Sequence, residues 1–136
     1  MGDSVPEAFR NQILYVTAQV LFSKKNYREA LSYAQRWIKT QREPTADGHL
    51  LIGHAYYQLK EYDRALSKVI DAIKKRTSAG NVSKEGTLNL LSAIYRETGQ
   101  LEKTIPVIKQ LIKHYTMGAY QLTLDKVREE LSNSKK

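Results

Sequence analysis

Metal binding or acid–base catalysis in this chain would rest on three histidines and 14 carboxylates, because there is no cysteine. Two of the histidines, His49 and His54, fall on one predicted helix but are five residues apart. Five residues correspond to about 140° around an α-helix, whereas two ligands of one metal need a shared face, as at a spacing of four. The histidines therefore predict no metal site.

The carboxylates lie where charge pairing and solubility account for them. Glu61 and Asp63 flank a predicted turn, and Glu129 and Glu130 lie on the outer side of the last amphipathic stretch. The sequence contains no glycine-rich phosphate loop of the GxGxxG or GxxxxGKS/T kind. We therefore expect no enzyme activity, no cofactor and no catalytic residue.

Residues 45–76 contain two amphipathic patterns joined by a tight turn. In each pattern, apolar or small residues recur at spacings of three and four, which places them on one face of a helix. They are Leu51, Ile52, Ala55, Tyr56 and Leu59 in the first pattern and Tyr62, Ala65, Leu66, Val69, Ile70 and Ile73 in the second. Gly53 and Ala65 fall where two close helices must touch. A short connection between such helices predicts an antiparallel hairpin.

The spacing of this hairpin resembles the tetratricopeptide repeat, a helical hairpin of about 34 residues. The matching positions are His49, Ile52, Gly53 and Tyr56, followed by Tyr62, Ala65, Val69 and Ala72. The signature formed by Tyr62 and Ala65 recurs 35 residues earlier as Tyr27 and Ala30. A weaker copy lies 39 residues later, at Leu101 and Thr104.

The resemblance implies an all-α fold, a right-handed superhelix of three antiparallel helical hairpins and a C-terminal capping helix. We expect one domain over residues 1–136, with hairpins at about 7–42, 45–76 and 83–115. The capping helix, at about 118–132, would cover the apolar face that the last hairpin leaves open.

In a tetratricopeptide array, the first helices of successive hairpins line a concave groove, so the resemblance also implies a partner-binding surface here. Its mixture of aromatic, aliphatic and hydrogen-bonding groups fits an extended peptide or a partner helix. The positions implied are Tyr15, Gln19, Phe22, Leu50, His54, Tyr57, Asn89 and Arg96. The alternative is that about half of the inner positions, especially Leu50, Leu51 and Leu90, are core between hairpins. We expect Gln19, His54 and Tyr57 to be exposed.

A more particular resemblance covers residues from about 14 to 124. Its motifs are the runs PTADGHLLIGHAYYQLKEYDRAL, LNLLSAIYRETGQLEKTIPVIKQLIKHY and GAYQLTL. These runs are similar to bacterial tetratricopeptide proteins encoded beside TonB energy-transduction genes. The resemblance implies a periplasmic protein that assists outer-membrane transport through protein contacts. The N-terminus has no signal-peptide pattern, so a domain cut from a larger protein and a cytoplasmic protein both stay open.

The formal net charge of +8 allows nucleic acid, an acidic partner or an anionic membrane surface. The basic residues gather on the second helix of each predicted hairpin, whose outer side faces solvent. They are Lys24, Lys25, Arg28, Arg36, Lys39 and Arg42, then Lys68, Lys74, Lys75 and Arg76, and finally Lys103, Lys109 and Lys113. We interpret them first as a solvated outer surface, with electrostatic docking as the alternative.

Two other functions remain as alternatives. Pentatricopeptide repeats are also helical hairpins and read RNA bases through inner side chains. A phosphate-tracking groove should be basic inside, whereas the inner positions here include Tyr15 and Leu50, so the sequence favours a protein partner over RNA. Self-association is the other alternative, with Phe9, Ile13 and Leu14 as interface residues on an open first face. No apolar run reaches the ~18 residues of a membrane span.

Overall fold

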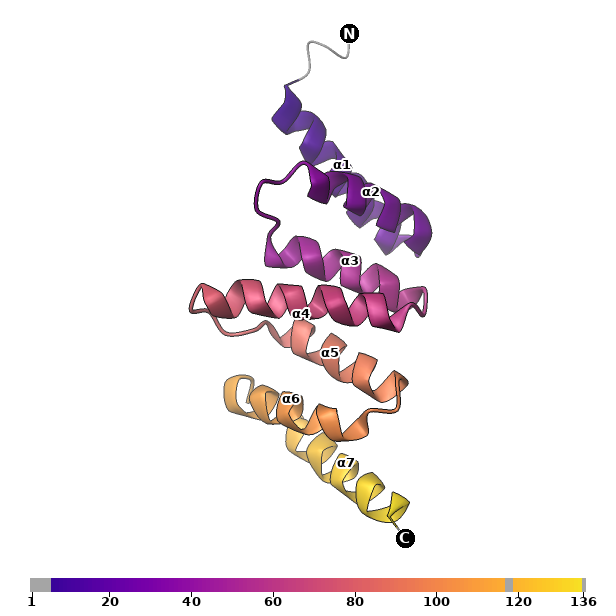
Figure 1. The fold of residues 1–136 in the computed structure, drawn as a ribbon, viewed down its shortest axis with the longest axis vertical. Coiled ribbons are helices and arrows are strands. Elements are labelled where there is room, and N and C mark those ends of the chain that lie inside the picture. Colours follow the sequence, from indigo (N-terminus) through magenta and orange to yellow (C-terminus); the bar gives the residue numbers. More distant parts are fainter. Residues whose placement is uncertain (1–5, 117–118, 136) are drawn as a thin grey trace. The chain divides into compact units, whose positions relative to one another are not determined.

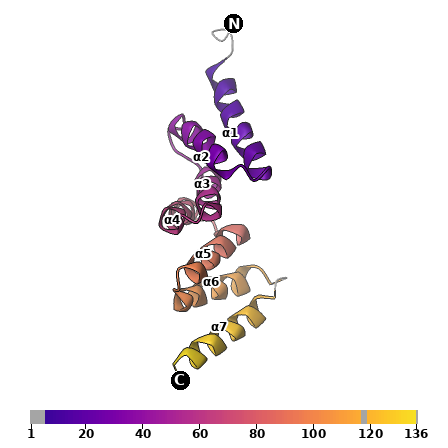
Figure 2. The ribbon, with the colours of Figure 1, turned by 90° about the vertical axis from the view of Figure 1, so that its right-hand side faces the viewer.

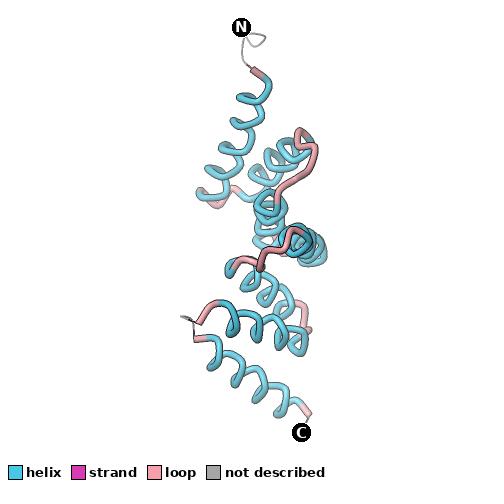
Figure 3. The backbone as a smooth tube through the Cα atoms, turned by 90° about the vertical axis from the view of Figure 1, so that its left-hand side faces the viewer, coloured by secondary structure: helices cyan, strands magenta, loops and turns pink. Residues whose placement is uncertain are grey.

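A computed structural model of the chain describes residues 6–116 and 119–135, which form seven α-helices joined by loops (Figures 1 and 3). In order they are α1 (Glu7–Ser23), α2 (Tyr27–Lys39), α3 (Ala46–Gln58), α4 (Tyr62–Ser78), α5 (Glu85–Glu97), α6 (Leu101–His114) and α7 (Tyr120–Ser134). These described residues contain no strand. Neighbouring helices contact one another as in a helical repeat array, which confirms the all-α prediction. The predicted start of the capping helix, residue 118, lies outside the described residues.

The chain divides into two compact units, Met1–Ala72 and Ile73–Lys136, hereafter unit 1 and unit 2. In unit 1, α1 lies against α2 and α2 against α3 (Figure 2). A hydrogen bond from Gln35 Nε2 to Tyr56 Oη, 2.8 Å long, joins α2 to α3. The core of this unit consists of Ala18, Ala30, Leu31, Ala34, Trp37, Ile52, Ala55, Tyr56, Ala65, Val69 and Ala72.

Two glycines of α3 allow close contacts within unit 1. A Cβ atom on Gly53 would lie 3.1 Å from Cγ2 of Val69, which confirms that α3 and α4 touch at this position. A Cβ atom on Gly48 would lie 2.6 Å from Cζ3 of Trp37, well inside normal contact distance. The large indole at position 37 therefore requires a residue without a side chain on the facing helix.

The helix ends repeat the same turn. Lys25 and Lys60 have positive φ angles of 65° and 62°, and Gly80 and Gly99 have 80° and 74°. In each turn the residue after the left-handed one donates its N–H to a carbonyl five residues back, as Asn26 does to Leu21. This is the pattern of a Schellman cap, which satisfies the free carbonyls at a helix end. The two lysines are 35 residues apart, so the turn follows the repeat period.

In unit 2, α5 lies against α6 and α6 against α7 (Figure 2). Ile108, Leu124 and Val127 form a buried cluster between α6 and α7. The N-cap residue of α5 is Lys84. Ser83, just before it, is buried, and its carbonyl accepts a hydrogen bond from Tyr115 Oη.

Candidate partner-binding surface

The first and third helices bring two of the predicted groove residues together in unit 1. The ring of Phe22 on α1 meets the imidazole of His54 on α3, with centroids 5.9 Å apart and planes at 69°. Phe22 also meets the ring of Tyr27 edge-on at 5.2 Å. Phe22 and His54 are both half-buried, so their rings support each other and still reach solvent.

The other predicted residues of unit 1 differ in exposure. Gln19, one turn before Phe22 on α1, is exposed, whereas Leu50 is half-buried. The ring of Tyr15 lies 4.4 Å from that of Trp37 and belongs to the edge of the core. Tyr57 is half-buried beside Tyr62, with ring centroids 5.7 Å apart. Of the three residues that we expected to be exposed, Gln19 is exposed, whereas His54 and Tyr57 are half-buried.

Burial determines the charge of the imidazole on this surface. Desolvation lowers the pKa of His54 below its usual 6.5, because the protonated ring loses hydration when it is buried. The ring is therefore neutral near pH 7, with one nitrogen that donates a hydrogen bond and one that accepts. A neutral imidazole that is open to solvent on one side can form hydrogen bonds with a polypeptide backbone.

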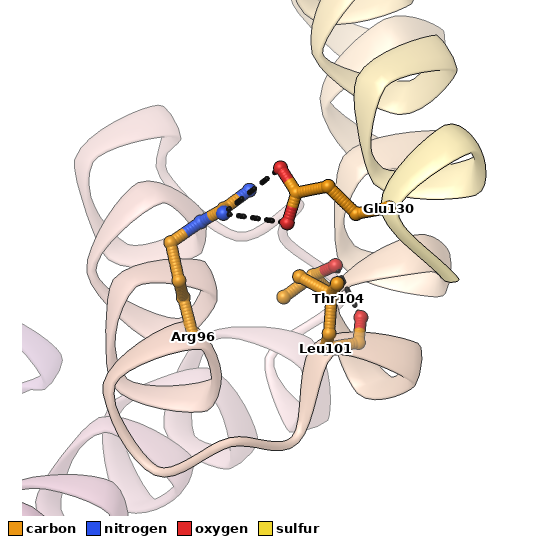
Figure 4. Close-up of polar contacts among 4 residues, drawn as sticks. All are labelled: Arg96, Leu101, Thr104 and Glu130. Carbon is orange, nitrogen blue, oxygen red and sulfur yellow. Dashed lines mark hydrogen bonds and ion pairs between the residues drawn. The ribbon is translucent and has the colours of Figure 1, made fainter. Parts of the chain in front are cut away.

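In unit 2, the two predicted groove residues on α5 both contact α7. The guanidinium of Arg96 pairs with the carboxylate of Glu130 at 3.4 Å (Figure 4). Asn89 Nδ2 donates a hydrogen bond of 3.2 Å to Tyr120 Oη. Both residues are exposed, and the ion pair is half open to solvent, so its contribution to stability is small.

Tyr120 also donates a hydrogen bond from its hydroxyl to the carboxylate of Glu85 at the start of α5. This hydrogen bond is the main cause of the raised pKa of Tyr120, because it stabilises the protonated phenol. The hydrogen bond from Asn89 acts in the opposite direction and lowers the pKa. Burial and the negative charge of Glu85 raise the pKa further. The start of α7 is thereby fixed to α5.

Repeat spacing is the signal in the sequence that points to these contacts. Arg96 and Glu130 are 34 residues apart, and Asn89 and Tyr120 are 31 apart. Phe22 and His54 in unit 1 are separated by a similar 32 residues. These spacings are close to one repeat length, so α7 lies against α5 as the first helix of a further hairpin would.

The outer basic side chains of unit 1 are open to solvent. Lys24, Lys25, Arg28, Arg36, Lys39 and Arg42 are all exposed. Only one of them meets an aromatic ring among the described contacts: the guanidinium of Arg36 lies 5.2 Å from the ring centroid of Tyr33. Within residues 6–116 and 119–135, no cluster of three or more histidine or carboxylate side chains could hold a metal ion. None of the helices in the same ranges is long and apolar enough to cross a membrane.

Comparison with protein families gives a match in the first half of the chain. The family described as "Anaphase-promoting complex, cyclosome, subunit 3" matches residues 5–72, half of the chain. The chain belongs to this family. It is a family of tetratricopeptide-type repeats, which confirms the repeat prediction. No curated protein matches the chain.

Families of this type are generally non-enzymatic and indicate a protein-interaction scaffold with protein partners. Repeats of this kind bind along extended concave surfaces. The finer resemblance to the TonB-associated proteins gains no support from these comparisons and stays a prediction from its motifs. The groove residues and the single-domain organisation likewise stay predictions.

Proposed function

We propose that the surface formed by α1 and α3 in unit 1 binds an extended peptide or a helix of a partner protein. The observation that supports this most is the contact between Phe22 and His54, which joins two successive first helices, with Gln19 exposed one turn away. We call Gln19, Phe22, His54 and Tyr57 the aromatic surface.

The chemistry of the aromatic surface favours a polypeptide ligand. Half-buried rings held by their neighbours lose little conformational freedom on binding and can still bury apolar area, and aromatic residues are enriched at protein interfaces. The neutral imidazole of His54 and the amide of Gln19 offer donors and acceptors for a peptide backbone. None of the four residues is basic at pH 7, so phosphate groups of RNA find no counter-charge among them.

A peptide selection tests the proposal. Random peptides displayed on phage are selected on the intact chain, and the best binder is synthesised and titrated against two variants. Gln19→Arg adds a positive charge on the aromatic surface, and Ser32→Arg adds the same charge at an exposed position of α2. We expect at least about tenfold weaker binding for Gln19→Arg, because a bulky charge would displace the peptide, and unchanged binding for Ser32→Arg. Equal binding to both variants would overturn the proposal.

The motifs shared with TonB-associated proteins favour one class of partner, a protein of a bacterial envelope transport system. The probe for this finer proposal is the periplasmic domain of a TonB-type protein, titrated against the wild-type chain and the same two variants. Binding to the wild-type chain that is lost in Gln19→Arg supports the finer proposal. If the TonB-type domain does not bind the wild-type chain, the finer proposal is wrong and the general proposal is unaffected. An RNA oligonucleotide at low salt serves as the opposing probe, because only a basic site would bind it.

A further inference from the structure

The turns that end α1 and α3 each place a lysine in the left-handed region of backbone conformation. Lys25 has a φ of 65° and Lys60 a φ of 62°, whereas the turns that end α4 and α5 have Gly80 and Gly99 in this region. A residue with a Cβ atom is strained in this conformation, and glycine is not. We call Lys25 and Lys60 the turn lysines.

No polar contact of the described residues accounts for a lysine at either position. Both side chains are exposed, and within residues 6–116 and 119–135 neither forms an ion pair or a side-chain hydrogen bond. A residue held in a strained conformation, with no such contact to offset the strain, is a candidate for function. A lysine ammonium on an exposed turn can bind an anionic group of a partner.

The surroundings of the turn lysines repeat as well. Each turn lysine lies three residues after a half-buried ring of the aromatic surface, Phe22 or Tyr57. Its backbone N–H donates a hydrogen bond to the carbonyl of that residue, at 2.9 Å for Phe22 and 3.0 Å for Tyr57. The ring centroid of Phe22 lies 5.2 Å from that of Tyr27, and the centroid of Tyr57 lies 5.7 Å from that of Tyr62. Unit 1 therefore contains, one repeat apart, two copies of a lysine beside an aromatic pair.

We propose that the turn lysines bind two acidic side chains of the same partner peptide whose apolar residues contact the aromatic surface, an inference that rests on the function proposed above. The contact between Phe22 and His54 brings the ends of α1 and α3 together. The two lysines therefore lie about one helix spacing apart, roughly 8–10 Å. An extended chain advances about 3.3 Å per residue, so three residues cover this distance. The partner segment carries Asp or Glu at two positions about three residues apart, with an apolar residue beside them.

The charges near the turn lysines favour an acidic peptide, most strongly at Lys25. Residues 24–29 include three basic residues and one acidic residue, whereas residues 60–64 include two of each. Lys25 should therefore contribute more to binding than Lys60. RNA fits this surface less well, because its backbone carries a charge at every nucleotide and requires a continuous basic track. The neighbouring Phe22 and Tyr57 are uncharged.

Glycine variants test the proposal without disturbing the turns. Lys25→Gly and Lys60→Gly remove the two charges, and glycine adopts both φ angles without strain, so the fold should be kept. The phage-selected peptide should bind about threefold more weakly to each single variant, with the larger loss for Lys25→Gly, and at least about tenfold more weakly to the double variant. The control is Lys39→Gln with Arg42→Gln, which removes the same net charge at exposed positions near the other end of α2. Binding to this control should be unchanged.

Charge exchange between the two partners separates specific ion pairs from a general electrostatic effect. A peptide whose acidic residues are replaced by their amides should bind the wild-type chain and the double glycine variant equally, because the pairs are then absent from both complexes. A peptide with lysine at those positions should bind the double variant Lys25→Glu with Lys60→Glu more tightly than the wild-type chain.

The outcomes distinguish this proposal from the function on which it rests. If Gln19→Arg weakens binding but the loss of the turn lysines or of the peptide carboxylates does not, this inference is wrong and the proposed function stands. If Gln19→Arg leaves binding unchanged, the proposed function fails, and the inference fails with it. An RNA oligonucleotide that binds more tightly than the peptide at physiological salt, and is lost in the double glycine variant, would also overturn the inference.

Discussion

Gly48 gives the sharpest test of how unit 1 is packed. A methyl group at this position would place its carbon 2.6 Å from Cζ3 and 2.9 Å from Cη2 of Trp37. Ordinary carbon contacts are about 3.5–4.0 Å, so the indole would have to move by about 1 Å. Trp37 is 8% exposed and lies against Tyr15, so its ring has little room.

The two opposing energies can be compared. Gly to Ala in a helix gains up to about 1 kcal/mol of helix propensity, whereas overpacking a core costs about 1–3 kcal/mol. We expect Gly48→Ala to lower the free energy of unfolding by about 1 kcal/mol. Gly86 lies in the first turn of α5, where an added methyl group would meet no atom within 4 Å. Gly86→Ala should therefore raise the free energy of unfolding by up to about 1 kcal/mol.

Urea denaturation provides the measurement. Trp37 is the single tryptophan of the chain, so its fluorescence reports the environment beside Gly48 directly. Trp37→Phe removes the outer ring atoms that an added methyl group would meet. In the Trp37→Phe background, Gly48→Ala should therefore be neutral or stabilising. The double-mutant cycle should then give a coupling energy between positions 48 and 37 of about 1 kcal/mol or more. If Gly48→Ala proves as stabilising as Gly86→Ala, with unchanged fluorescence, the close contact is absent and the reasoning fails.

Three further predictions concern stability. Gly53→Leu should destabilise the chain by about 1–3 kcal/mol in urea, because its side chain would enter the contact with Val69; an unchanged midpoint would contradict that contact. Lys60→Gly should stabilise by about 0.5–1 kcal/mol, because glycine adopts the φ of 62° without strain; a loss of stability would mean that the lysine side chain matters more than the turn. Burial lowers the folded-state pKa of His54, so its stabilising effect is complete above the unfolded pKa of 6.5 and is lost as pH falls from there through the folded pKa. Thermal unfolding between about pH 5 and 7.5 should therefore depend less on pH in His54→Gln than in the wild type; an equal dependence in both would contradict the burial of this imidazole.

The sequence predicted the helical hairpins well because their signals are local and periodic. The start predicted for the first hairpin, about residue 7, is where α1 begins in the structure, and the small residue at Gly53 marked a real helix contact. The closeness of Gly48 to Trp37 was not predicted, because it depends on matching volumes on two helices that lie in different hairpins. Periodicity shows which face is buried but not which side chain fills which gap.

The candidate site was predictable in position more than in detail. Repeat spacing placed Phe22 and His54 on first helices, and the structure brings them together. Their half-burial depends on neighbouring rings such as Tyr27, which the pattern of inner positions does not include. Likewise, Asn89 and Arg96 were identified as groove positions, but their bonds to α7 required α7 to be recognised as the equivalent of a first helix.

The most direct test of the central claim is an NMR titration of the isotope-labelled chain with the phage-selected peptide. If the α1–α3 surface binds it, the largest shifts should fall on the Gln19 side-chain amide, the His54 imidazole and the amides around Phe22. Shifts concentrated instead on Arg28 and Arg36 of the outer basic side would contradict the account and assign binding to the opposite face.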